Sequence, residues 1–75
     1  MKIRLKLMGN LRAKLADGNT LDVPDGTTID GVLKKLDIPS NHVHLVMVND
    51  RHELDRTYAL TLDDELMVMP PVGGG

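Results

Sequence analysis

Polar and apolar residues alternate strictly at the start of the chain. In Lys2-Ile3-Arg4-Leu5-Lys6-Leu7 the three apolar side chains share one face, which predicts a half-buried strand. Gly9-Asn10 interrupts the alternation, and apolar residues spaced four apart in residues 11–15 predict a short helix that ends near Asp17-Gly18. The alternation returns over Thr20-Leu21-Asp22-Val23, where we expect a second strand.

The strongest periodic signal predicts an amphipathic helix in the middle of the chain. Thr27 or Thr28 can cap its N-terminus, and Pro39 is expected to end it because a proline excludes the preceding residue from the helical region. Gly31 predicts close packing of the helix against a strand, since an interior glycine otherwise costs about 1 kcal/mol relative to alanine. The apolar stripe follows the spacing i, i+3, i+4 and i+7 and consists of Ile29, Val32, Leu33 and Leu36.

Three further strands are predicted in the second half of the chain. Val43–Val48 is rich in β-branched residues, and Asn49-Asp50 favours a tight turn into a short strand over Arg51–Leu54. Tyr58–Leu62 is compatible with a loop containing a helical turn or with a poor strand, and Glu65–Met69 predicts the last strand. We therefore expect an α+β fold, a mixed sheet of about five strands with one main helix on one face. The other face is left to solvent or to a partner.

Strand parity places the four internal methionines together. If the apolar side chains of the first strand face the helix, Met8 points to the opposite side of the sheet, and the same argument turns Met47, Met67 and Met69 away from the helix. Flexible methionine side chains are common on surfaces that must fit a partner, which predicts a docking face. The alternative is that some of them fill the core, because a one-residue shift in register would reverse a whole strand.

Size and composition exclude several classes of function. A chain of 75 residues builds one small core, so a catalytic cleft between domains is excluded. The absence of cysteine excludes a disulfide, a thiol nucleophile and a Cys-ligated zinc. A net charge of −2, with both signs interspersed and a single aromatic residue, argues against nucleic-acid binding, and no apolar run approaches the roughly 18 residues of a membrane span. A small fold without disulfides suits the cytoplasm.

Histidines and carboxylates give only weak candidate sites. His42 and His44 would share one strand face, with His52 beyond the turn, but the spacing matches no metal-binding motif. We therefore expect solvated histidines at the strand edge and no bound metal. The acidic run Asp63-Asp64-Glu65 predicts a solvated turn, with a docking patch for a basic partner as the alternative.

The C-terminus carries the most distinctive chemistry. Pro70-Pro71 ends the last strand, and Val72-Gly73-Gly74-Gly75 is expected to form an extended, mobile tail. Glycine disfavours ordering of a tail, so three in a row suggest a narrow channel in which no Cβ fits. The reactive group would then be the α-carboxylate of Gly75, which is inert until it is activated, usually as an acyl-adenylate made from ATP. A frayed tail or a cloning remnant is the alternative.

These features together resemble the ThiS/MoaD family of ubiquitin-like sulfur carriers over essentially the whole chain. The ordered set of motifs ending in Gly-Gly is more specific than any single motif. The matching segments are Lys2–Leu7, Gly9–Arg12, Val23–Ile29, Val46–Asp50, Leu62–Leu66 and Met69–Gly75. The resemblance implies a β-grasp domain over residues 1–69 and an extended tail over residues 70–75.

The resemblance also implies a role for each part of the tail. A ubiquitin-activating-type enzyme would adenylate Gly75 with Mg-ATP, and sulfur from a persulfide donor enzyme would replace AMP to leave a thiocarboxylate. Gly73-Gly74 would thread the channel, Pro70-Pro71-Val72 would set the exit direction, and the outward methionines would dock. The chain would bind no cofactor itself and would act as a carrier rather than an enzyme.

Two pathways compete within the family. The small subunit of molybdopterin synthase typically has a short helix after its first strand and a Pro-Pro-Val segment before its glycines, and residues 11–15 and 70–72 match both. The resemblance therefore favours molybdopterin synthesis, with the synthase large subunit as partner, over thiamin thiazole synthesis with thiazole synthase. A protein modifier joined to lysines as ubiquitin is, or a plain interaction module, are the remaining alternatives.

Overall fold

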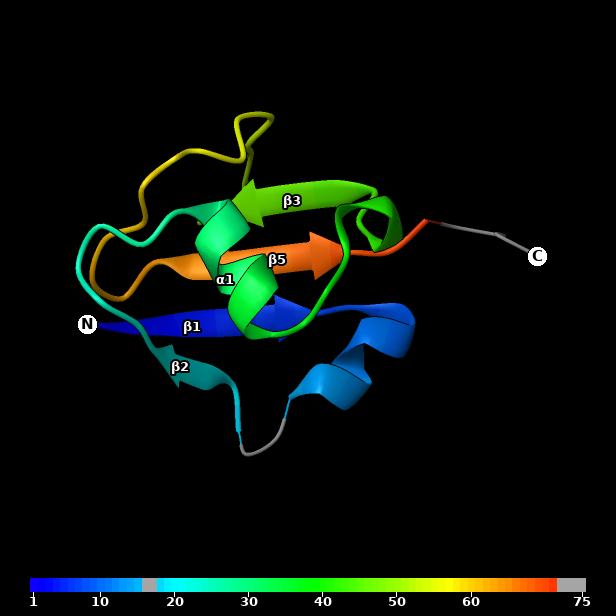
Figure 1. Ribbon diagram of the computed structural model, residues 1–75, viewed down its shortest axis with the longest axis horizontal. Helices are drawn as coiled ribbons and strands as arrows, with labels where there is room; N and C mark the ends of the chain where they lie inside the picture. The colour runs from blue at the N-terminus through cyan, green and yellow to red at the C-terminus, as the bar shows by residue number, and fades with distance from the viewer. Residues whose placement is uncertain (16–17, 72–75) are drawn as a thin grey trace.

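The computed structural model describes residues 1–15 and 18–71, which form one five-stranded sheet covered on one face by a helix (Figure 1). The strand order is β2-β1-β5-β3-β4, with β1 and β5 parallel at the centre and the other pairs antiparallel. The elements are β1 (Lys2–Leu7), η1 (Gly9–Lys14), β2 (Thr20–Asp22), α1 (Ile29–Lys35), η2 (Ser40–His42), β3 (Leu45–Val48), β4 (Arg51–His52) and β5 (Glu65–Met69).

The alternation in β1 is confirmed by its burial. Ile3, Leu5 and Leu7 are buried, whereas the three basic residues that alternate with them are exposed. Strand β5 repeats this pattern, with Leu66 and Val68 fully buried. These strands and the apolar stripe of α1 form a single hydrophobic core between the helix and one face of the sheet. The opposite face of the sheet carries no helix in the described part of the chain (Figure 1).

Helix α1 is capped as predicted at its start but ends differently. The Thr28 hydroxyl oxygen accepts a hydrogen bond from the Gly31 amide at 3.1 Å. At the other end Asp37 adopts φ 57°. Its amide donates a hydrogen bond to the Lys34 carbonyl, and the Ile38 amide donates one to the Leu33 carbonyl. This is a Schellman motif with aspartate at the position that usually holds glycine. The helix therefore ends through Asp37, before Pro39 acts as a stop.

The predicted reason for Gly31 is wrong. A Cβ at this position would lie 3.0 Å from the Thr27 Cγ2 atom and 3.5 Å from the Thr28 hydroxyl oxygen. The close neighbours are thus the residues that begin the helix and not a strand.

Several predicted boundaries differ from the structure for local reasons. The first helix is a 3-10 helix that starts at Gly9 and ends at Lys14, before the predicted end near Asp17-Gly18, of which Asp17 lies outside the described residues. β3 begins at Leu45 instead of Val43, because η2 first turns the chain with hydrogen bonds from His42 to the Pro39 carbonyl and from Val43 to the Ser40 carbonyl.

The predicted strand over Arg51–Leu54 also shortens, because β4 ends at His52 and Leu54 is left 83% exposed. Of the segment Tyr58–Leu62, only Ala59 forms an isolated bridge, to Thr28, so the loop interpretation is the correct one. No helix in residues 1–15 and 18–71 is long and apolar enough to cross a membrane.

The acidic run before β5 is not a solvated turn throughout. Asp63 is exposed, but Asp64 is only 6% exposed and accepts hydrogen bonds from the Asn49 side chain and the Thr61 amide, both at 2.8 Å. The Asn49 side-chain oxygen in turn accepts the Glu65 amide at 2.9 Å. Asp64 therefore ties the β3–β4 turn to the start of β5, and the prediction of a solvated turn is wrong for this residue.

Candidate functional site

The helix-free face of the sheet is centred on methionines. Met67 on β5 lies directly opposite Met47 on β3, and Met69 lies opposite Leu45 in the same register. Because the residues between them, Val46 and Val48 among others, are buried toward the helix, these side chains point away from it. We call the half-buried set Met8, Leu45, Met47, Met67 and Met69 the methionine face.

Polar residues flank the methionine face on both sides. The row that crosses the sheet runs from Lys6 on β1 through Met67 and Met47 to His52 on β4. Both end residues are exposed. An apolar centre with a polar, partly cationic margin is the arrangement found at the centre and rim of protein–protein interfaces.

Arg4 fixes one margin of this face. Its guanidinium donates two hydrogen bonds to the Asp63 carbonyl, at 3.2 and 3.1 Å, and lies 3.7 Å from a Glu65 carboxylate oxygen. The salt bridge is largely exposed, so it contributes little stability by itself. Its effect is to hold the β1 side of the face in place beside the loop that leads into β5.

The end of β5 is held from both sides at the point where the tail begins. The Met8 amide donates to the Val68 carbonyl at 3.0 Å, and the His44 amide donates to the Met69 carbonyl at 2.8 Å. Pro70-Pro71 then leaves the sheet between η1 and η2 (Figure 1).

Two shallow hollows flank these prolines. One, of about 360 Å³, is lined by Met8, Gly9, Asn10, Met69 and the two prolines. The other, of about 210 Å³, is lined by Asn10, Asn41, His42 and the same prolines. The root of the tail therefore adjoins the methionine face.

The structure places some predicted site residues and not others. Met8, Met47, Met67 and Met69 lie on one face, and Pro70 and Pro71 lie at its edge. The predicted tail residues Val72, Gly73, Gly74 and Gly75 lie outside the described residues.

The histidines do not come together as one strand face. His42 belongs to η2, His44 precedes β3 and His52 lies on β4. Within the described ranges, no group of three or more His, Cys, Asp or Glu side chains is arranged to hold a metal ion.

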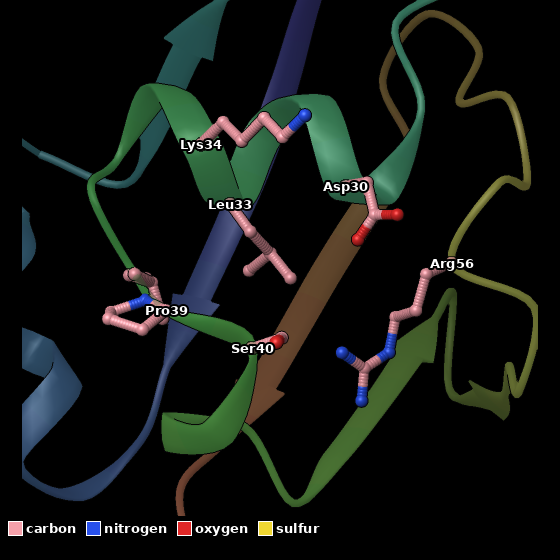
Figure 2. Close-up of a pocket in the computed structure, with 7 residues that line it drawn as sticks. Asp30, Leu33, Lys34, Pro39, Ser40 and Arg56 are labelled. Atoms are coloured by element: carbon pink, nitrogen blue, oxygen red, sulfur yellow. The ribbon is translucent and has the colours of Figure 1, made fainter.

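A separate hollow, of about 570 Å³, lies on the helix side of the molecule (Figure 2). Asp30 and Lys34 of α1 border it, and Arg56 reaches into it from the opposite loop. Its floor is formed by the buried side chains Leu33 and Ile38. Opposite charges share its rim and no predicted site residue lines it, so it is separate from the tail and the methionine face.

Two residues of the candidate site, Leu45 and Gly9, were not predicted from the sequence. Leu45 belongs to the methionine face, and its parity with Met47 was the available signal. Gly9 packs against the tail root, which nothing in the local sequence indicated beyond the end of a strand.

The fold and the site together define a class of protein. A mixed five-stranded sheet with one main helix, whose last central strand leads into the C-terminus beside an open apolar face, is a ubiquitin-like β-grasp fold. The chain belongs to the ThiS family, whose model matches residues 5–75. The resemblance to the ThiS/MoaD family and the predicted β-grasp fold are both confirmed.

Solved structures show the same fold. SAMP1 from Haloferax volcanii aligns over 100% of both chains with 24% identity and a TM-score of 0.69. A second structure, the small archaeal modifier protein 1 of H. volcanii, has 25% identity over 95% of this chain and 98% of its own, also with a TM-score of 0.69. A chain from the complex of subunits 1 and 2 of the molybdopterin-converting factor of Helicobacter pylori 26695 has 17% identity, full coverage of both chains and a TM-score of 0.65. None of the curated proteins matches this sequence.

Proposed function

We propose that this protein is a sulfur carrier whose C-terminal carboxyl group, on Gly75, is converted to a thiocarboxylate. The observation that carries the proposal is that the ThiS family match extends through residue 75 and so includes the three terminal glycines. The open methionine face beside the tail root supports it, because a carrier must dock on one enzyme to be loaded and on another to be unloaded.

The proposed chemistry uses the tail and not a pocket of this chain. A terminal carboxylate oxygen attacks the α-phosphate of ATP in a partner enzyme and releases pyrophosphate, which gives an acyl-adenylate. A persulfide sulfur from a donor enzyme then attacks the acyl carbon and expels AMP, which forms a C–S bond and gives an acyl disulfide. A second thiol of the donor cleaves the S–S bond that came from the persulfide, which leaves a disulfide on the donor. The product is a thiocarboxylate, a soft sulfur nucleophile. Mg-ATP and sulfur are thus supplied by the partners.

Each part of the chain takes one role in this scheme. The methionine face docks the activating enzyme and later the sulfur acceptor, since methionine side chains adapt to more than one partner. Pro70-Pro71-Val72 sets the direction of the tail, and Gly73-Gly74 passes through the enzyme's channel without a Cβ. Residues 1–69 serve as the domain that presents residues 70–75.

Molybdopterin synthesis is the pathway we favour. The short helix η1 after β1 and the Pro70-Pro71-Val72 sequence match the small subunit of molybdopterin synthase. In this role the chain would pair with the synthase large subunit and donate its sulfur there. Thiamin thiazole synthesis, with thiazole synthase as the acceptor, is the alternative within the family.

Reconstitution with the activating enzyme of the same organism tests the proposal. With Mg-ATP and a persulfide donor, the mass of the chain should rise by about 16 Da, the replacement of one oxygen by sulfur. A chain ending at Gly73 is the matched control and should not gain mass. The activating enzyme is first shown to be active with a carrier that it is known to adenylate. An unchanged mass of the full chain with this active enzyme would contradict the proposal.

A second candidate function is a protein modifier joined to lysines. The observation that favours it is the 25% identity to a structure described as small archaeal modifier protein 1. Proteomic detection of lysine side chains bonded to the Gly75 carboxyl group would support this function. Their absence from cells grown under several conditions would count against it.

A further inference from the structure

Gly9 lies against the Pro70 ring at the root of the tail. Gly9 has φ +55°, a left-handed conformation that favours glycine, and a Cβ added to it would lie 2.9 Å from the Pro70 Cγ atom and 3.6 Å from Pro70 Cδ. Real Cβ atoms essentially never come within 3.0 Å of another heavy atom. The proline ring is closed on the backbone nitrogen of Pro70, so it cannot swing aside as the end of a flexible side chain would.

The contact lies where the pairing of β1 with β5 ends and the tail begins. β1 and β5 pair in parallel as far as Leu7 and Val68, and the Met8 amide still donates to the Val68 carbonyl. Beyond this point Pro70 has no N–H to extend the ladder. The packing of its ring on Gly9 therefore takes the place of strand pairing at the step where the chain leaves the sheet.

We propose that Gly9 is a positioning residue for the C-terminal tail. Its missing Cβ lets the Pro70 ring lie against the start of η1, and this sets the direction in which Pro71 leaves the sheet. The kinetic part of this inference rests on the proposed function, because it concerns how well the Gly75 carboxylate reaches the activating enzyme.

Adenylation kinetics of Gly9→Ala test the inference. Docking through the methionine face is retained, so the KM for the carrier should stay within about twofold. Misplacement of the tail root should lower kcat for pyrophosphate release by about tenfold or more, since a 1 Å error in placing a reacting group costs up to about 100-fold. A KM effect without a kcat effect would overturn the inference.

A matched control separates the contact from backbone strain. Gly26 has φ +85°, and a Cβ there would meet nothing within 4 Å, so Gly26→Ala imposes similar strain at a site beside Met1, away from the tail. Its kcat should equal that of the wild type. Equal losses of kcat in Gly9→Ala and Gly26→Ala would overturn the inference.

Pro70→Ala tests the same contact from the other side and does not strain Gly9. It should also lower kcat, and the double variant should be no slower than the slower single variant, because both remove one contact. If Gly9→Ala fails to fold, Pro70→Ala alone decides, and an unchanged kcat for it would overturn the inference.

An NMR measurement separates the inference from the proposed function. The wild-type chain should show a nuclear Overhauser effect between a Gly9 Hα and the Pro70 Hγ protons, and Gly9→Ala should shift the Val72 amide resonance where Gly26→Ala does not. If no activating enzyme accepts the wild type, the proposed function fails and these signals still decide the role of Gly9. Absence of the Gly9–Pro70 effect in the wild type would overturn it.

Discussion

The hydrogen bonds of Asn49 to Asp64 and Glu65 make Asn49→Gly the most informative stability variant. Asn49 has φ 51°, which glycine adopts without strain, so the substitution removes the side-chain bonds and leaves the turn intact. It deletes the 2.8 Å bond to the Asp64 carboxylate and the 2.9 Å bond from the Glu65 amide. Asp64 is 6% exposed, so its freed oxygen has little access to water.

The expected loss follows from these contacts. A hydrogen bond to a charged group contributes about 1.5–3 kcal/mol, and the partly solvated bond from Glu65 contributes about 0.5–1 kcal/mol. Relief of the left-handed conformation by glycine returns a fraction of this, of about 0.5–1 kcal/mol. The net free energy of unfolding should fall by about 2 kcal/mol, which lowers the Tm of a domain of this size by about 8–16 °C.

The same variant should change the acid sensitivity of the fold. Burial raises the pKa of the Asp64 carboxyl. Hydrogen bonds from Thr61 and Asn49, together with the charge of Arg4, lower this pKa by more than burial raises it, so it lies below the ordinary 3.8. The unfolded carboxyl therefore takes up a proton at higher pH than the folded one. Its contribution to stability is complete above pH 3.8 and is lost as the pH falls toward the folded pKa. Asn49→Gly removes one of the hydrogen bonds that lower the pKa of Asp64, so the folded and unfolded pKa values of Asp64 lie closer together. The variant should therefore lose less stability than the wild type as the pH falls.

Urea unfolding at neutral pH and at several acidic pH values measures both effects. Asp50→Gly is the matched control, because Asp50 has φ 66° in the same turn and its exposed side chain lies outside the Asn49–Asp64 bonds. It should leave the free energy of unfolding unchanged or slightly higher. Equal stability of Asn49→Gly and Asp50→Gly, with the same acid dependence as the wild type, would refute the argument.

Two further predictions concern the helix end and the docking face. Asp37→Gly should raise the free energy of unfolding by about 0.5–1 kcal/mol in urea titrations, because glycine adopts φ 57° without strain; a decrease would contradict the Schellman assignment. Met67→Asp should weaken binding to the activating enzyme at least about tenfold by calorimetry, since it buries a charge at the centre of the methionine face. Leu62→Asp is the control, at a 64% exposed leucine beside Met1, and equal losses of affinity in both variants would contradict this use of the face.

The parts of the fold that rest on periodic burial could be predicted from the sequence. The alternation of Lys2–Leu7 determines which face of β1 is buried, and the same parity places Met47 and Met67 on the opposite face. These predictions succeed because the hydrophobic pattern is repeated over several residues and an error in register would expose a whole strand.

Features that depend on distant partners could not be predicted. Asp64 lies in an acidic run, and its burial depends on Asn49, which is 15 residues away in the chain. Gly9 and Pro70 lie near opposite ends of the sequence, so only the parallel pairing of β1 with β5 reveals their contact. The Schellman motif that ends α1 was missed for a different reason: its left-handed residue is Asp37, and aspartate adopts positive φ less readily than glycine and gives no stop signal.

The intact mass of the protein isolated from its own cells shows whether Gly75 carries a thiocarboxylate. We expect a species about 16 Da heavier than the translated chain, with the added mass confined to the peptide that ends at Gly75 and lost on hydrolysis of the thiocarboxylate. Recovery of the unmodified chain alone, from cells in which the sulfur-dependent pathway is active, would contradict it.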